Sequence, residues 1–316
     1  MSEKGSPIYR FPMQTECEGE VLQELSIKRN MLWNSSGSIF YLGCQWLLSI
    51  VVVRLSSDYS SAGVLALAMA IGNIFTPLAG YRMRTMQVSD VKHEYCSGQY
   101  MAFRIVTVLI ALILCLVYSL LTCQLDTLPA ISLFLLYKAI ELIIDVMHGL
   151  DQQHMRLDIA GKSMMARGIL TILSFAAAFL LSGSLEIAFL AMITSTLPVG
   201  IFYDLRMSSR FESLVPQIDF KTVSHLLLIC MPAVLAAVLS SATLTIPRQY
   251  LSYAYGDSLL GIYSSVASPV AIIQMGATYL YSPLLGKFSE EYASKSVVSI
   301  ETLPCLLHSS GFIFNS

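Results

Sequence analysis

Charged residues are scarce in this sequence. Only 13% of its 316 residues are charged and 55% are hydrophobic, and the mean hydropathy is +0.66. A soluble globular domain carries about 25% charged residues, so most of this chain has no need to face water. The formal net charge of −2, without a basic run or zinc-ligand spacing, argues against a nucleic-acid partner. Because one membrane span takes about 20 residues, the length allows several spans but no large soluble domain.

Motifs for covalent chemistry are missing as well. The seven cysteines make no CxxC pair, and the sequence has no HExxH, nucleophile elbow, P-loop or GxGxxG motif. Cys44, Cys115 and Cys230 fall within apolar runs, where cysteine behaves as a small hydrophobe. We therefore expect no disulfide framework, no metal site and no cofactor. Four of the five histidines fall in predicted loops or the tail: His93, His148, His154 and His308.

Long apolar stretches make up most of the sequence. Eight of them are close to the length that crosses about 30 Å of hydrocarbon as a helix. Helices are expected because unsatisfied backbone groups cannot face lipid. The sequence therefore predicts an all-α integral membrane protein with spans at about 31–53, 62–81, 104–122, 128–148, 164–182, 185–203, 223–246 and 259–281.

Lysine and arginine are distributed unevenly between the two sides of these spans. With the N-terminus inside, sixteen of them fall on the inner side, only Arg54 and Arg248 fall in outer loops, and Lys138 lies within a span. Positive charge accumulates on the cytoplasmic side of membrane proteins. The count predicts that both termini are cytoplasmic and that the outer loops are short.

The fourth predicted span contains three ionisable residues, Lys138, Glu141 and Asp145. At about 100° per residue they share one helix face. Charged groups within a span cost about 2.5–3.5 kcal/mol each on insertion scales, and they are tolerated when they pair or face a wet cavity. Lys138 and Glu141 can neutralise each other at i,i+3 spacing, and the same face can also line a cavity.

Four arginines, Arg54, Arg84, Arg104 and Arg248, are predicted to lie at span ends. Each has an ordinary reading as a side chain that extends to the membrane interface. Together they also suit a phosphorylated head group, because guanidinium binds phosphate through two parallel hydrogen bonds.

Prolines and small residues recur within the spans. Proline removes a helix hydrogen bond and kinks the helix, and transporters use broken helices at moving or binding positions. Alanines at four-residue spacing favour close helix packing. The prolines are Pro77, Pro198, Pro232 and Pro269, and the alanine series are Ala62, Ala66, Ala70 and Ala233, Ala237.

Several loop sequences follow the spans in a characteristic order. They are Arg54 with 62–68 (AGVLALA), 81–91 (YRMRTMQVSDV) with Tyr100 and Arg104, 145–158 (DVMHGLDQQHMRLD), 160–163 (AGKS) with Arg167 and Gly168, 247–250 (PRQY), 255–257 (YGD), 260–265 (LGIYSS), and 283–287 (PLLGK) with Tyr292. In this order the chain, over about residues 28–295, resembles the bacterial polysaccharide-biosynthesis flippases, the O-antigen and capsule repeat-unit translocases of the multidrug/oligosaccharidyl-lipid/polysaccharide exporter superfamily.

The resemblance implies a fold, a cargo and a location. The fold would be two six-helix bundles packed as a V around a cavity open to one side at a time. The cargo would be an oligosaccharide on a polyprenyl pyrophosphate, moved without covalent chemistry across the bacterial cytoplasmic (inner) membrane by alternating access. Its partners would be this lipid-linked oligosaccharide, membrane lipids and other polysaccharide-assembly proteins. The candidate residues of the substrate path are Arg54, Arg84, Gln87, Asp90, Arg104, Lys138, Glu141, Asp145 and Arg248.

One departure from the family concerns the number of spans. The family has twelve or more, and this sequence predicts eight, so we expect a truncated second bundle. The expected division is a cytoplasmic segment (1–30), a first six-helix bundle (31–203), a linker (204–222), the start of a second bundle (223–295) and an atypical tail (296–316).

Three alternative functions stay open at this stage. The first is a cation-coupled multidrug exporter of the same superfamily, for which Glu141 and Asp145 would be the intramembrane carboxylates. The second is a membrane enzyme of polysaccharide assembly, although the short outer loops offer few catalytic groups. The third is a non-functional truncated remnant.

Overall fold

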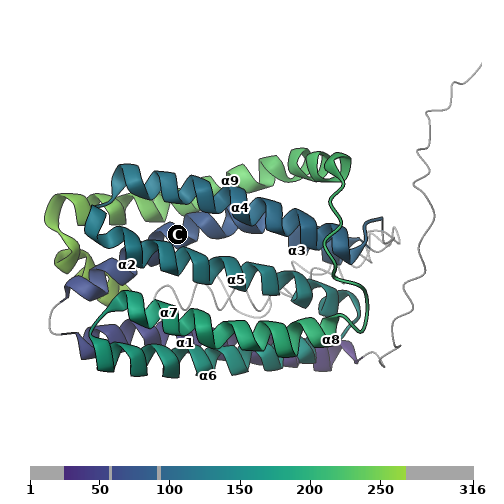
Figure 1. The fold of residues 1–316 in the computed structure, drawn as a ribbon, viewed down its shortest axis with the longest axis horizontal. Helices are drawn as coiled ribbons and strands as arrows, with labels where there is room; N and C mark the ends of the chain where they lie inside the picture. The colour runs from purple at the N-terminus through teal and green to yellow at the C-terminus, as the bar shows by residue number, and fades with distance from the viewer. Residues whose placement is uncertain (1–24, 57–58, 91–93, 268–316) are drawn as a thin grey trace, which may run out of the picture.

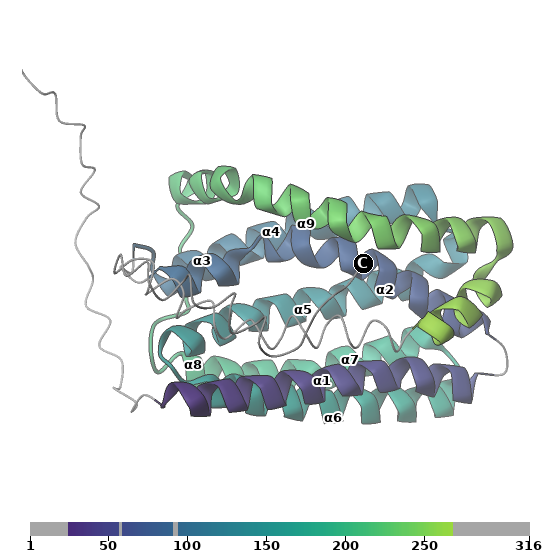
Figure 2. The same cartoon turned by 180° about the vertical axis from the view of Figure 1, so that it is seen from behind.

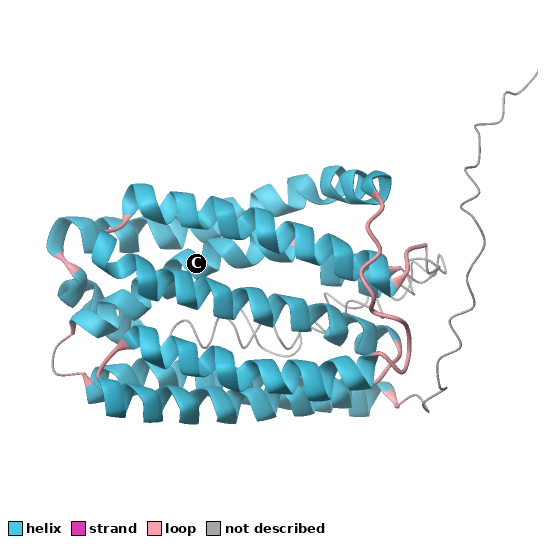
Figure 3. Cartoon of the chain, viewed as in Figure 1, coloured by secondary structure: helices cyan, strands magenta, loops and turns pink. Residues whose placement is uncertain are grey.

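The chain folds as a bundle of long helices. A computed structural model describes residues 25–56, 59–90 and 94–267, and within them the regular structure is entirely helical (Figure 3). The long helices run along the longest axis of the molecule (Figures 1 and 2). The elements in chain order are α1 (Ile27–Leu55), α2 (Ser60–Gly80), α3 (Met83–Ser89), α4 (Ser97–Thr122), the 3-10 turn η1 (Leu125–Thr127), α5 (Leu128–Gln153), α6 (Leu157–Ser182), α7 (Leu185–Pro198), the π-helical segment η2 (Val199–Leu205), α8 (Arg206–Ser208) and α9 (Phe220–Tyr255).

The prediction of an all-α integral membrane protein is confirmed. Among the described residues, six helical segments are long and apolar enough to cross a membrane: Ile27–Leu55, Ser60–Ser89, Ser97–Thr122, Leu157–Ser182, Leu185–Ser208 and Phe220–Tyr255. They match predicted spans one, two, three, five, six and seven. The fourth, α5, has the same length as α4 and α6 and lies within the bundle (Figure 1). It differs in carrying Lys138, Glu141 and Asp145 in its apolar part.

The outer surface of the bundle is apolar. Large hydrophobic side chains are exposed on every long helix except α2, for example Leu121 at 80% and Leu181 at 89%. In water such a surface would mark an interface or cause aggregation, whereas in a bilayer it is the surface that meets lipid tails. The distribution fits a multi-pass membrane protein.

Several helices extend beyond the predicted spans. α4 begins at Ser97 and not near position 104, and α9 continues to Tyr255 and not only to about 246. The sequence missed these extensions because the added turns are more polar than the spans. α9 begins where Asp219 accepts hydrogen bonds from the hydroxyl and amide of Thr222 and the amide of Lys221, and these bonds hold the pKa of Asp219 below its usual range. The eighth predicted span lies mostly outside the described residues, and the proposed division of the chain into bundles stays a prediction.

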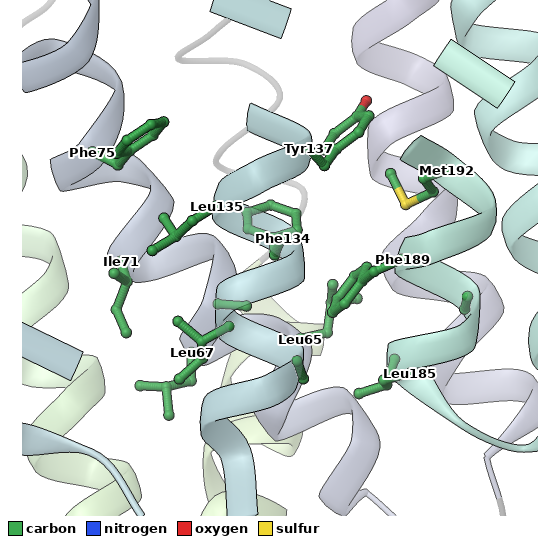
Figure 4. Packing of buried hydrophobic residues seen from close by; sticks show 14 of the residues in the cluster. Leu65, Leu67, Ile71, Phe75, Phe134, Leu135, Tyr137, Leu185, Phe189 and Met192 are labelled. Carbon is green, nitrogen blue, oxygen red and sulfur yellow. The ribbon is translucent and has the colours of Figure 1, made fainter. Parts of the chain in front are cut away.

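The largest apolar core joins α2, α5 and α7. Phe134 of α5 packs against Phe189 of α7, with ring centroids 5.4 Å apart, and both are buried. Figure 4 shows the surrounding aliphatic side chains and the hydroxyl of Tyr137, which points away from the two phenylalanines. Ala62, Ala66 and Ala70 of the first alanine series are buried in this part of α2.

The second alanine series behaves differently. Ala233 of α9 is exposed, and Ala237 lines a pocket described below. Within the described residues this series is therefore not a helix-packing stripe.

Two glycines bring α1 and α6 into contact. A Cβ atom added to Gly37 would lie 2.7 Å from the Cα atom of Gly161, and one added to Gly161 would lie 2.6 Å from the carbonyl oxygen of Trp33. Glycine in a helix interior costs stability relative to alanine, so its presence here is explained by the close approach of the two backbones. The pair allows α1 to pack closely along α6, and Figure 2 shows these two helices side by side.

We expect Gly37→Ala to destabilise the protein. The added methyl group meets backbone that cannot move aside, and overpacking of this kind costs about 1–3 kcal/mol. Gly43→Ala, in the same helix, is the matched control, because its Cβ would meet no described atom within 4 Å. Thermal unfolding of the purified protein in detergent should show a lowered Tm for Gly37→Ala and an unchanged or raised Tm for Gly43→Ala. Equal Tm values would show that the two helices are not packed this closely.

The helix path breaks between α2 and α3. Tyr81 and Arg82 adopt left-handed backbone conformations, with φ of 45° and 54°. For residues with a Cβ atom this region costs about 1–2 kcal/mol each. Pro77 lies one turn earlier in α2, and the Tyr81 hydroxyl donates to the carbonyl oxygen of Leu227 in α9 at 3.0 Å. The break separates α3 from α2, and Arg84, which follows it, bonds to Asp145 of α5.

Candidate functional site

An open pocket of about 210 Å³ lies beside this break. Five helices and the Arg82 link contribute to it: the end of α2, the start of α3, the interior of α4 and α5, and one residue of α9. Its lining residues are Thr76, Pro77, Gly80, Arg82, Met83, Arg84, Thr85, Arg104, Leu142, Asp145 and Ala237. Three arginines and one carboxylate therefore share a small, largely apolar space.

Asp145 is the counter-ion of two of these arginines. Arg84 donates from Nη1 to Oδ1 at 2.7 Å, and Arg104 donates from Nη2 to Oδ2 at 3.3 Å. Arg84 also donates to Oε1 of Gln152 at 3.2 Å and 3.3 Å. The side chains of Arg84 and Asp145 are 27% and 28% exposed, so both are accessible to a ligand.

Arg104 forms the buried wall of the pocket. It is 1% exposed, and its Nη1 donates to the carbonyl oxygen of Ala79 at 3.2 Å. The last carbonyl groups of a helix have no partner within the helix, and α2 ends at Gly80. The Ala79 carbonyl can therefore accept from Arg104 and from the hydroxyl of Thr107 at 2.8 Å. A cation is also favoured at a helix C-terminus by the helix dipole.

The charge of the pocket suits an anion. Arg82, Arg84 and Arg104 carry three positive charges against the single carboxylate of Asp145. Nε of Arg104 is buried and has no hydrogen-bond partner among the described residues. Arginine binds phosphate oxygens through two parallel hydrogen bonds, so a phosphate or pyrophosphate group is the ligand that this arrangement fits.

A second polar cluster lies about two turns away along α5. The predicted ion pair is present: Nζ of Lys138 donates to Oε2 of Glu141 at 2.7 Å. The hydroxyl of Tyr137 donates to Oε1 of Glu141 at 2.9 Å. From α1, Tyr41 is hydrogen-bonded to the Tyr137 hydroxyl at 2.7 Å, and Gln45 donates to both hydroxyls at 2.9 Å and 3.0 Å.

A third group of polar residues is fully buried where α5, α6 and η2 meet. Asp204 is 0% exposed, accepts from Ser163 at 2.8 Å and is bonded to Nε2 of His148 at 3.1 Å. Asp151 accepts from Ser208 at 2.9 Å. These bonds tie the π-helical segment after Pro198 to α5 and α6, which is a structural role.

The predicted substrate-path residues do not all meet. Arg84, Arg104 and Asp145 come together in the pocket, while Lys138 and Glu141 form their own pair. Arg104 lies inside α4, seven residues from its first residue, and is buried. Arg248 is likewise inside α9, and Arg54 is exposed in the last turn of α1. Neither Arg54 nor Arg248 lines the pocket.

Gln87 and Asp90 also lie outside the pocket. The Gln87 side chain is 0% exposed and lies so close to Gly149 that a Cβ atom added there would overlap its Oε1 atom. Asp90 accepts from the hydroxyl of Tyr100 at 2.9 Å and from the amide of Glu94 at 2.9 Å. Asp90 thus links the end of α3 to the start of α4, and Gln87 packs against α5.

Sequence reasoning missed three buried residues. His148 was expected in a loop but lies within α5 and is 2% exposed, and Arg167 was counted among the inner charges but is 5% exposed within α6. Asp204 was assigned to the linker and is 0% exposed. The helical position of His148 could have been predicted from the sequence, because the polar residues at 141, 145, 148 and 152 continue at helical spacing beyond the predicted end of the span.

The chain is similar to a protein of polysaccharide assembly. No protein-family model matches it. The "Capsular polysaccharide biosynthesis protein CapF" of Staphylococcus aureus is 24% identical over 265 residues, which are 82% of this chain and 65% of that protein. The chain thus spans a little under two thirds of the length of this relative.

Solved structures of transporters share the architecture. The MATE multidrug transporter DinF-BH, solved as a complex, superposes with a TM-score of 0.65 at 13% identity, covering 87% of this chain and 68% of that one. A variant of the Vibrio cholerae MATE transporter VcmN gives a TM-score of 0.51 at 12% identity, covering 82% of this chain and 65% of that one. The chain has a MATE-type fold. The expected likeness to the exporter superfamily is therefore supported at the level of the fold.

Proposed function

We propose that this protein is a membrane transporter that moves an oligosaccharide on a polyprenyl pyrophosphate across the cytoplasmic membrane. The observation that carries the proposal is the pocket in which Arg82, Arg84 and Arg104 meet the single carboxylate of Asp145. A pyrophosphate group carries more negative charge than the single carboxylate of Asp145, so it can balance the positive charge that Asp145 leaves unpaired. The pocket is therefore matched to the head group of such a lipid.

The ion pairs suggest how the head group would be held. Arg104 is fixed by burial and by the Ala79 carbonyl, whereas Arg84 is partly exposed and lies on the short helix α3 after the left-handed break. Arg84 can exchange Asp145 for a phosphate oxygen while Arg104 stays in place. Without ligand, Asp145 pairs with both guanidinium groups and offsets one of their two positive charges, which lowers the cost of these charges in a membrane.

Two comparisons support this proposal from different directions. The likeness to CapF comes from a protein named for capsular polysaccharide biosynthesis, and the fold is that of transporters. Transport of a lipid-linked glycan would account for both similarities. Membrane lipids and other proteins of polysaccharide assembly are the partners that follow from it.

A cation-coupled multidrug exporter is the second candidate. It is favoured by the fold shared with DinF-BH, which is described as a multidrug transporter, and by the intramembrane carboxylate of Glu141. Against it, Glu141 is already paired with Lys138 at 2.7 Å, and the carboxylate that lines the pocket, Asp145, is shared by two arginines. A cationic pocket repels a cationic drug and attracts a phosphate group.

Binding of polyprenyl pyrophosphate tests the proposed function. We expect the purified protein to bind this lipid in native mass spectrometry, and Arg84→Gln to weaken binding about tenfold or more, because a hydrogen bond to a charged group is worth about 1.5–3 kcal/mol. Arg54→Gln removes one arginine outside the pocket and should leave affinity within about twofold. Equal losses in both variants, or binding of the cationic dye ethidium in place of the lipid, would count against the proposal.

A further inference from the structure

Arg167 of α6 is a buried cation without a carboxylate partner in the described part of the chain. It is 5% exposed, its Nε atom is buried without a hydrogen-bond partner, and it makes no ion pair among these residues. An uncompensated charge in a low-dielectric interior costs several kcal/mol. A buried guanidinium of this kind calls for an anion.

Glu141, the acid that interacts with Arg167, is already engaged. Arg167 is close enough to interact electrostatically with Tyr137, Lys138 and Glu141. Glu141 accepts from both Lys138 and Tyr137, so its charge is balanced by the lysine. The cluster therefore holds two cations and one carboxylate, with one positive charge left over.

The polar side chains around Arg167 suit a sugar as ligand. The guanidinium carbon of Arg167 lies over the ring of Tyr41, 5.5 Å from its centroid. Tyr41, Gln45 and Lys138 are partly exposed, so a ligand can reach the group. The Tyr41 hydroxyl and the Gln45 side-chain amide are hydrogen-bonding partners for sugar hydroxyls.

We propose that this cluster binds the carboxylate of an acidic sugar in the transported oligosaccharide, with Arg167 as the residue that recognises it. This inference rests on the proposed function and names the class of glycan. The two polar clusters are connected by α5, where Lys138 and Asp145 are about 10 Å apart along the axis at 1.5 Å per residue. One substrate can therefore place its pyrophosphate at Arg84 and Arg104 and a nearby acidic sugar at Arg167.

A carboxylate fits the cluster better than a phosphate ester. A uronic acid carries one negative charge, which balances the one left over at Arg167. A phosphate monoester carries about −1.5 to −2 near neutral pH and would overcompensate it. The planar carboxylate also matches the two parallel donors of a guanidinium.

Three lipid probes test the inference on the unchanged protein. They are polyprenyl pyrophosphate alone, the same lipid carrying glucose, and the same lipid carrying glucuronic acid. We expect the glucuronic acid probe to bind at least about tenfold more tightly than the glucose probe. Equal affinity for the two sugar probes would overturn the inference and leave the proposed function standing, whereas no binding of any probe would overturn both.

Variants of Arg167 test whether this residue causes the preference for the glucuronic acid probe. Arg167→Gln should remove the preference for glucuronic acid and keep the affinity for polyprenyl pyrophosphate alone, and Arg167→Lys, which retains the charge, should recover part of the preference. Arg84→Gln should weaken all three probes alike. A preference that persists in Arg167→Gln would contradict the assignment. The comparison of probes on the unchanged protein decides the inference even where a variant does not fold.

Discussion

Asp145→Ala should strongly destabilise the protein. The substitution leaves Arg84 and Arg104 without their shared counter-ion, and Arg104 cannot reach water because it is 1% exposed. Removing one partner of a buried ion pair costs about 3–5 kcal/mol. We expect a large loss of folded protein, measured as the monodisperse fraction in detergent and as Tm.

The control for this variant is Asp126→Ala. Asp126 is an exposed acid in the η1 turn, and its removal should change stability by less than about 0.5 kcal/mol. The double variant Arg104→Met/Asp145→Leu should recover part of the loss, because it removes the buried charge together with its partner. If Asp145→Ala is as stable as Asp126→Ala, then Asp145 does not neutralise the arginines.

Asp204→Ala is expected to have the second large effect. It removes the acceptor of Ser163 and the partner of His148, both buried. Each buried polar group left unsatisfied costs about 1–3 kcal/mol, so the loss for the two groups should be about 2–6 kcal/mol in total. Circular dichroism during heating measures it.

The π-helical segment makes this prediction specific. Asp204 holds η2 against α5 and α6, so Asp204→Asn, which keeps the shape and the acceptor oxygen, should retain more stability than Asp204→Ala. Thr194→Ala is a control, since Thr194 is exposed and bonds only to its own helix. Identical Tm values for Asp204→Ala and Thr194→Ala would mean that the network does not hold the segment.

The membrane helices were predictable because an apolar run of span length is compatible with few structures other than a membrane-spanning helix. Six of them appear where the sequence places them. Their ends were less predictable, because the first turns of α4 and the last turns of α5 are polar and resemble loops. Polar residues at helical spacing, such as Asp145 and His148, are the signal that extends α5.

The composition of the candidate site was only partly predictable. The pair of Lys138 with Glu141 follows from their spacing alone. The pairing of Asp145 with Arg84 and Arg104 does not, because it depends on how α3 and α4 pack against α5. Arg54 and Arg248 looked equivalent to Arg84 in sequence, and only their positions in the fold separate them from the pocket.

Burial is the property that sequence indicated least. Arg104 and Arg167 look like cytoplasmic charges that set orientation, yet they are 1% and 5% exposed within α4 and α6. A one-dimensional charge count cannot distinguish an arginine at the interface from one held by the carbonyl of a neighbouring helix, as Arg104 is by Ala79. The predicted orientation of the termini stays a prediction.

Transport in reconstituted vesicles tests the central claim most directly. The protein is placed in vesicles that contain a fluorescent oligosaccharide on polyprenyl pyrophosphate, and the fraction of label accessible from outside is followed with time. We predict that the protein moves the labelled lipid, and that added polyprenyl pyrophosphate inhibits this movement whereas the cationic dye ethidium does not. Arg84→Gln should slow the movement at least about tenfold, and Arg54→Gln should leave its rate unchanged. Vesicles that accumulate ethidium while the labelled lipid stays on its original side would contradict the account.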